Sequence, residues 1–219
     1  MLIVSPIVAP ARASSNGTDG VGHVPTCPRF LPVSRKPDRE PAGRPLLQLD
    51  NIRSDGVVDL GDPYLISEAD YERWTVRIEA RPGDCVLTNV GRVGAAAQIP
   101  DGMRAALGRN MTGLRCRPAF EFPTFLIEAL RSDAVAAEIA LRTDSGTILN
   151  SLNVRSIPQI RVAVPPSPVL SRYEQFARPF RARMELAVRE RETLLASRLL
   201  LVRQLLGESR QPILEARLG

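Results

Sequence analysis

The prolines at positions 165, 166 and 168 and the long stretch that follows them constrain this chain more than any other feature. Proline lacks a backbone N–H and holds the preceding residue extended, so these prolines end whatever element comes before them. From residue 169 to residue 206 only Pro179 interrupts a sequence that is otherwise suited to a helix. Such a helix is roughly 55 Å long at 1.5 Å per residue. The sequence therefore predicts a compact domain followed by a long helix.

The expected helix carries a coiled-coil type stripe, which we call the seam. Its apolar residues alternate at spacings of four and three, and Arg191 and Arg198 occupy the intervening positions. A helix with so broad an apolar face is not stable alone in water, so the seam needs a second helix, from this chain or from another copy. The alternative is that the helix packs on its own domain. The helix-pairing residues that we expect are Phe180, Met184, Ala187, Leu194, Leu201 and Leu205.

Residues 46–168 read as an α+β domain with a mixed or antiparallel sheet. A helix is expected after Ser67, and another over residues 122–141 with an interruption at Ser132. The expected strands are 46–49, 57–60, 85–88, 93–99, 111–117 and 157–164.

Two further segments flank these elements. Residues 1–45 are rich in proline, glycine, serine and arginine, and we expect them to form a disordered or loosely ordered leader. The short apolar start lacks a basic n-region and is broken by Pro6 and Pro10, so it does not read as a signal peptide. Residues 207–219 form a tail after the helix, and no stretch has the length of a membrane span.

Charge and cysteine content favour a binding protein over an enzyme. The net charge of +5 favours a polyanionic partner, although many basic proteins bind no nucleic acid. The single imidazole, His23, lies in the leader, so Ser–His and Cys–His mechanisms lack a base. Three cysteines with one histidine make neither a zinc site nor a disulfide framework, which indicates a reducing, cytoplasmic compartment. We expect no metal, no cofactor and no catalytic residue.

Three segments, taken in order, carry a resemblance to a known family. They are GDCVLTNVGRVGAAAQIP from Gly83, LGRNMTGLRCRP from Leu107, and GTILNSLNVRSIPQIRVAVPP from Gly146. A Phe125-Leu126 helix lies between the second and third, and a long helix with an early Gln175 follows. This series resembles the target recognition domain of type I restriction–modification specificity subunits over residues 46–206. The family usually joins two recognition domains by two antiparallel helices, whereas this chain has one of each and looks like a half-subunit.

The resemblance implies a protein that catalyses nothing and reads a short half-site in double-stranded DNA. It also implies partners: a methyltransferase subunit, a translocase–nuclease subunit, and self-pairing through the helix. Arginine reads guanine and asparagine reads adenine by paired hydrogen bonds. The loops offer these DNA-contacting candidates: Arg53, Asn89, Arg92, Arg104, Arg109 and Asn110.

Alternatives remain open at this point. Each of these six side chains taken singly fits a solvated surface charge or a turn former better than a DNA contact. The chain as a whole could be a non-catalytic dimerising scaffold whose basic charge is incidental, or an inactive remnant of a specificity subunit.

Overall fold

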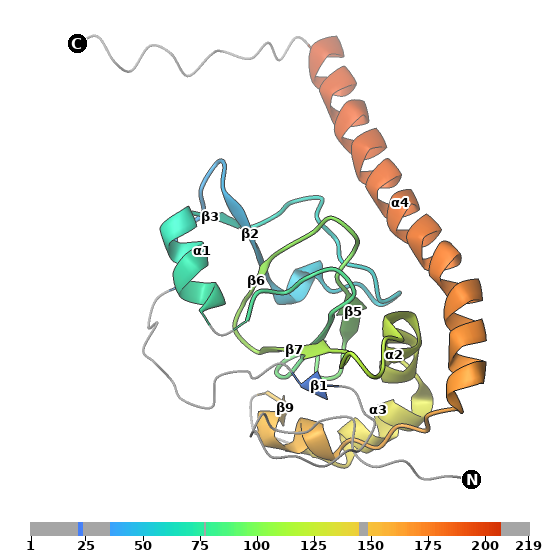
Figure 1. Cartoon of the computed structure of the whole chain (residues 1–219). Helices are drawn as coiled ribbons and strands as arrows, with labels where there is room; N and C mark the ends of the chain where they lie inside the picture. The colour runs from blue at the N-terminus through green and yellow to red at the C-terminus, as the bar shows by residue number, and fades with distance from the viewer. Residues whose placement is uncertain (1–21, 24–35, 77, 145–148, 207–219) are drawn as a thin grey trace.

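The computed structural model describes residues 22–23, 36–76, 78–144 and 149–206. These residues form an α+β domain with small mixed and antiparallel sheets, followed by the helix α4 (Ser167–Leu205). Figure 1 shows α4 running along one side of the domain and projecting beyond it. The expected fold class and the expected long helix are both confirmed. Pro179 lies inside α4 without ending it.

The central sheet has the strand order β1-β7-β4-β5, and all of its pairings are antiparallel. Its middle strands are β4 (Cys85–Thr88) and β7 (Met111–Arg115), with β5 (Ala96–Gln98) at one edge. Every residue of β4 is buried, because α2 and α3 cover one face and the second sheet lies against the other. This explains why β4 reads in the sequence as an unbroken apolar run.

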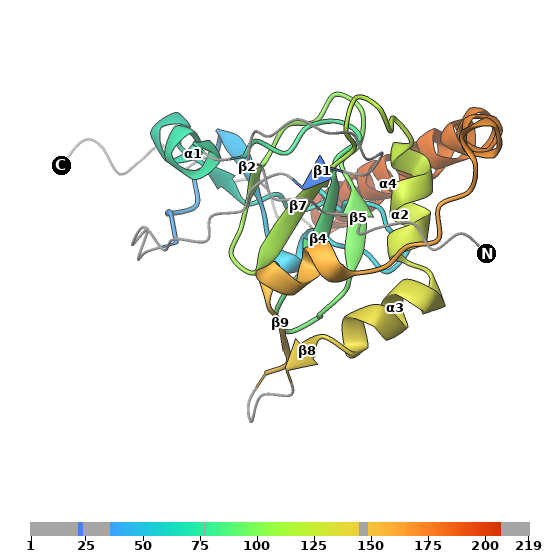
Figure 2. The same ribbon diagram turned by 60° about the horizontal axis from the view of Figure 1, so that its bottom comes forward.

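A second, three-stranded sheet has the order β3-β2-β6. Strand β2 (Arg44–Leu47) pairs antiparallel with β3 (Leu65–Ile66) and parallel with β6 (Ala106–Leu107). Helix α1 (Glu68–Thr75) packs on this sheet, and its N-cap Ser67 accepts a hydrogen bond from the backbone N–H of Asp70. Figures 1 and 2 both place α1 on the side of the domain opposite α4.

Two short helices follow the central sheet in the chain. They are α2 (Pro123–Leu130) and α3 (Asp133–Ala140), separated by the N-cap Ser132 as the sequence predicts. Their apolar faces pack with β4 and β7 in the main core, and α2 also contacts α4. The hairpin of β8 (Thr143–Asp144) and β9 (Ser151–Leu152) follows α3 (Figure 2).

Two of the expected strands are wrong. Residues 157–164 are not a strand: η2 (Val154–Gln159) is a 3-10 helix, and an extended segment follows it to α4. Ile157, Ile160 and Val162 are nevertheless buried, so the apolar alternation reflects an irregular chain laid across the core. Residues 57–60 form only isolated bridges, beside the short 3-10 helix η1 (Leu49–Asn51).

Part of the expected leader contacts the domain. The backbone of β1 (Gly22–His23) pairs with β7, and the Glu40 N–H donates to the Leu65 carbonyl at 2.9 Å. The Tyr64 hydroxyl donates to the Pro37 carbonyl at 2.7 Å. Contacts with the domain thus begin before the expected boundary at residue 46. Residues 1–21 and 24–35 of the leader and the tail 207–219 lie outside the described residues.

Within the described ranges, no helix combines the length and the hydrophobicity that crossing a bilayer requires.

Candidate nucleic-acid interface

One end of the central sheet gathers several polar loops, and we call it the loop end. It comprises residues 48–53, 89–95 and 108–110. Hydrogen bonds hold the three loops together: the Arg92 guanidinium donates to the Ile52 carbonyl at 2.9 Å, and the Asn89 N–H donates to the Asn110 carbonyl at 2.7 Å. The parallel pairing of β2 with β6 brings the first loop beside the third. Five of the six predicted DNA-contacting residues therefore lie at one end of the domain.

Asn89 is wrong as a DNA contact. Its side chain is 5% exposed and forms hydrogen bonds of 2.8 and 3.1 Å with the Thr112 hydroxyl. Its backbone carbonyl accepts the Leu152 N–H at 2.7 Å, so the residue joins β4 to β7 and to β9. A buried amide that is satisfied in this way supports the fold and does not reach a base.

Arg53 lies at the loop end with its charge already paired. It donates two hydrogen bonds to the Asp55 carboxylate from Nε and Nη2, at 3.0 and 2.9 Å. Burial raises the pKa of Asp55, but the bonds from Arg53 and from the Val57 N–H outweigh it and lower that pKa overall. A guanidinium held by an ionised carboxylate has few free donors for a guanine, so Arg53 orders the loop.

Arg92, Arg109 and Asn110 are exposed at the loop end. Asn110 has a φ of +64°, a left-handed conformation that asparagine tolerates better than most residues, and it shapes the turn into β7. Arg92 donates one hydrogen bond to the Ile52 carbonyl, and most of its guanidinium group faces solvent. These three side chains are the ones that could contact a groove from this end.

Arg104 does not belong to the loop end. It precedes β6, at the end of the domain where Ala80 bridges Ala105, and its Nη1 lies 2.6 Å from Glu79 Oε2. Arg104 and Arg109 are close in the sequence, but β6 runs between them, so they lie at opposite ends of the domain.

Helix α4 docks on the domain with a stripe that the sequence does not reveal. Leu170, Arg181 and Val188 are buried on it, and Glu174 accepts the backbone N–H groups of Thr124 and Phe125 at 2.9 and 3.1 Å. Glu174 thus caps the N-terminus of α2, where a carboxylate is electrostatically favoured.

Arg181 is the centre of this docking stripe. It is 4% exposed and donates to the Gly56 carbonyl, with Glu185 at 3.4 Å and Glu128 at 3.9 Å balancing its charge. Because charged residues usually mark the solvent face of a helix, periodicity alone could not have placed this stripe against the domain.

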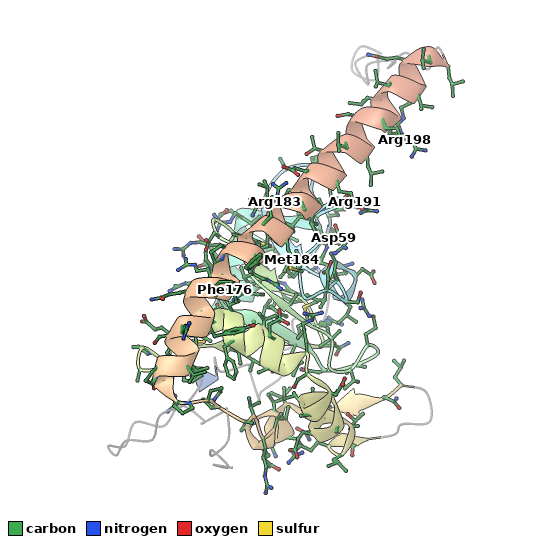
Figure 3. All side chains as sticks on the ribbon, turned by 90° about the vertical axis from the view of Figure 1, so that its right-hand side faces the viewer. Asp59, Phe176, Arg183, Met184, Arg191 and Arg198 are labelled. Carbon is green, nitrogen blue, oxygen red and sulfur yellow. The ribbon has the colours of Figure 1, made fainter. Side chains whose placement is uncertain are left out.

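The predicted seam faces away from the domain. Phe180, Met184, Leu194, Leu201 and Leu205 are exposed by 62, 41, 70, 60 and 86%. Ala187 is exposed as well. Figure 3 views the molecule from the side of α4 and shows Met184, Arg191 and Arg198 along the helix. The alternative that α4 packs on its own domain is therefore right for the docking stripe, whereas the apolar seam takes no part in that packing.

The positive charge of the chain is not on the domain. Residues 36–166 contain 16 Lys and Arg against 17 Asp and Glu, a net charge of −1. Residues 167–205 contain eight arginines against four glutamates, a net charge of +4 out of the total +5. Any attraction of the domain to a polyanion must come from local clusters and not from its overall balance.

Two observations concern metal binding and thiol reactivity. Within the described ranges, no group of three or more His, Cys, Asp or Glu side chains could hold a metal ion. Burial raises the pKa of the Cys85 thiol well above its usual range and that of Cys116 to about 12. Both thiols are therefore protonated core residues and poor nucleophiles at neutral pH.

Comparisons with known proteins find similarities among solved structures. No family model matches the sequence, and no curated protein does. Among solved structures, the chain is similar to a chain of one described as "Structural basis underlying complex assembly and conformational transition of the type I R-M system". The TM-score is 0.46 and the identity 20%, covering 73% of this chain and 37% of the other. This chain thus spans little more than a third of the length of that protein.

Proposed function

We propose that the chain is a non-catalytic DNA-recognition subunit of a type I restriction–modification system, which directs methyltransferase and nuclease subunits to a DNA half-site. The observation that carries the proposal is the two-sided helix α4. A mixed stripe of Leu170, Glu174, Arg181 and Val188 fixes it to the domain, while an apolar seam of coiled-coil spacing remains exposed. A spacer helix in a half-subunit requires this arrangement, because it must hold its own domain and also a second helix.

The loop end is the proposed surface for base reading. Arg92, Arg109 and Asn110 are exposed there on loops that the central sheet and η1 hold together. Arginine and asparagine are the side chains that read guanine and adenine most directly in the major groove. Loops fixed on a rigid sheet can vary in sequence without disturbing the core, which suits a module that reads different targets.

The proposed second helix is α4 of another copy, in an antiparallel orientation. In a parallel pair, Arg191 would face Arg191 of the second copy and Arg198 would face Arg198, so that like charges would lie opposite each other. In the antiparallel register that covers the whole seam, Phe180 faces Leu205, Met184 faces Leu201, Ala187 faces Arg198 and Arg191 faces Leu194. Arg198 then lies against a small residue, from which its long side chain can reach Glu190 of the second copy.

A dimerising scaffold without DNA binding is the second candidate. The observation that favours it is the net charge of −1 on the domain, because such a domain has no general attraction for a polyanion. The two candidates share the exposed seam and differ only at the loop end.

Co-expression with the methyltransferase subunit of the same locus, followed by mapping of methylated adenines, tests the proposal. We expect methylation at one interrupted sequence, and the double variant Arg92→Ala/Asn110→Ala should abolish or shift it while the complex still forms. The matched control is Gln159→Ala/Arg161→Ala, which likewise removes one exposed arginine and one exposed amide, at the end of η2. Complex formation without any methylated sequence would instead support the scaffold.

A further inference from the structure

Glu79 organises an arginine cluster at the end of the domain opposite the loop end. Its Oε2 atom lies 2.6 Å from Arg104 Nη1 and 3.2 Å from Arg81 Nε, and its Oε1 atom lies 3.6 Å from Arg44 Nη2. The Tyr71 hydroxyl donates to Oε1 at 3.1 Å, and the Arg44 guanidinium stacks over the Tyr71 ring at 4.2 Å. One carboxylate therefore positions three guanidinium groups from three separate segments.

Arg115 extends the cluster from the end of β7. It forms a bidentate pair with Asp84, at 2.7 and 2.6 Å, and it donates to the Glu79 carbonyl at 3.1 Å. Asp84 is 3% exposed and also accepts the Arg81 N–H at 2.8 Å, so it is fully committed to the fold. The cluster is thus built on a buried carboxylate and not on loose surface side chains.

The charges of this cluster do not balance. Arg44, Arg81, Arg104 and Arg115 form salt bridges with two carboxylates, and Glu68 adds a longer-range attraction to Arg44, which leaves a local excess of at least one positive charge in a domain whose net charge is −1. Among the acidic residues that the structure describes, Glu79 has the most arginine partners. Arg81 and Arg104 are 53 and 55% exposed, so most of their donors face solvent. Neutralising Glu79 would need one arginine, not three.

We propose that this cluster is a phosphate-binding surface, which holds the backbone of duplex DNA. The planar guanidinium group matches two phosphate oxygens at once, and arginines fixed in advance lose little entropy when they bind. Phosphate contacts of this kind position a protein on DNA without reading its sequence. That the phosphate belongs to DNA rests on the proposed function, whereas the phosphate-binding chemistry of the surface does not.

The position of the cluster leaves α4 free to pair. Arg44 begins β2 and Arg104 precedes β6. Both strands belong to the sheet on which α1 packs. That sheet lies across the domain from α4 in Figures 1 and 2. DNA on this surface and a second copy on the seam therefore do not compete.

Salt titration of a labelled duplex of mixed sequence with the full chain tests the surface. The test variant is Arg81→Gln/Arg104→Gln, which removes two exposed arginines that share Glu79. The matched control is Arg142→Gln/Arg161→Gln, an equal charge change at two arginines near α3, where the Glu138 carboxylate pairs with the Arg142 side chain and accepts the backbone N–H of Arg161. Losing two phosphate contacts lowers the slope of log K against log salt by about 1.8, and we expect this only in the test variant. Arg81→Lys/Arg104→Lys keeps both charges and should keep the slope.

A second measurement separates the two proposals. Pyrophosphate should raise the Tm of the wild type and not that of Arg81→Gln/Arg104→Gln, because it offers the same oxygens without DNA. Equal slopes in the test and control variants would overturn the surface and leave DNA recognition standing. Stabilisation by pyrophosphate with no duplex binding would support the surface and overturn DNA as its source. No response to either ligand would overturn both.

Discussion

Single side chains that look alike in the sequence have opposite roles in the fold. Asn89 and Asn110 both stand in turns between strands, yet Asn89 is buried against Thr112 while Asn110 is exposed with a positive φ. Arg53 and Arg92 lie side by side, yet only Arg53 is held by a carboxylate. Local composition could place these residues in loops, but burial and pairing depend on segments that are distant in the chain. Arg44, Arg81 and Arg115 were not predicted for the same reason.

The amide of Asn89 provides the first prediction. Asn89→Ala leaves the Thr112 hydroxyl buried without its partner, and we expect the free energy of unfolding to fall by about 1–3 kcal/mol. Urea unfolding measures this, with Asn110→Gly as a control that keeps the left-handed conformation accessible. An Asn89→Ala variant of unchanged stability that no longer bound DNA would show that the side chain contacts a base after all.

The carboxyl of Glu79 predicts a pH dependence. Burial raises its pKa, but hydrogen bonds from Arg104, Tyr71 and Arg81 outweigh that effect and lower the pKa overall. A carboxyl whose pKa is lowered in the folded state contributes stability that is present above its unfolded pKa of about 4.3 and lost as the pH falls through the folded pKa.

Glu79→Gln should therefore flatten the acid side of the stability curve, below about pH 5. Urea midpoints measured from pH 7 down to pH 3 test this. Parallel curves for the variant and the wild type would mean that the arginines do not depend on this carboxylate.

At the scale of elements, hydrophobic periodicity predicted the helices and most of the strands but not which face of α4 packs on the domain. The α4 helix, its seam and the split between α2 and α3 follow from spacing, a cap and the absence of breakers. The strand expected over residues 157–164 was wrong because an irregular chain that crosses a core can bury alternate residues without a pairing strand. The docking stripe of α4 was missed because it consists largely of charged residues.

Glu174 gives the prediction at this scale. Glu174→Ala removes the acceptor for two backbone N–H groups at the start of α2, which costs about 1–2 kcal/mol of stability. Glu174→Gln keeps one acceptor and loses the charge, so its effect should be intermediate. Urea unfolding of both variants tests the cap, with the exposed neighbour Gln175→Ala as control. Equal stability of all three variants would mean that α4 does not cap α2.

At the scale of the whole molecule, three surfaces point in different directions. The loop end, the arginine cluster and the seam belong to separate parts of the chain, and the positive charge resides mainly on α4. A domain of net charge −1 with a local arginine excess should bind duplex DNA weakly when alone, and pairing through α4 doubles the contacts. DNA binding by this protein therefore depends on pairing through α4.

The antiparallel register makes the seam test specific. Met184→Glu/Leu201→Glu places two glutamates opposite each other in each half of the pair, whereas Leu194→Glu places a glutamate against Arg191 of the second copy. The first variant should separate the copies, and the second should be tolerated. The control is Leu186→Glu/Leu200→Glu, two exposed leucines on α4 outside the seam.

Light scattering at tens of micromolar protein, with and without the methyltransferase subunit, is the most direct measurement. We expect the mass of two copies for the wild type, for Leu194→Glu and for Leu186→Glu/Leu200→Glu, and the mass of one copy for Met184→Glu/Leu201→Glu. A wild type that stays monomeric in both samples, or a Met184→Glu/Leu201→Glu variant that still pairs, would contradict pairing through the seam.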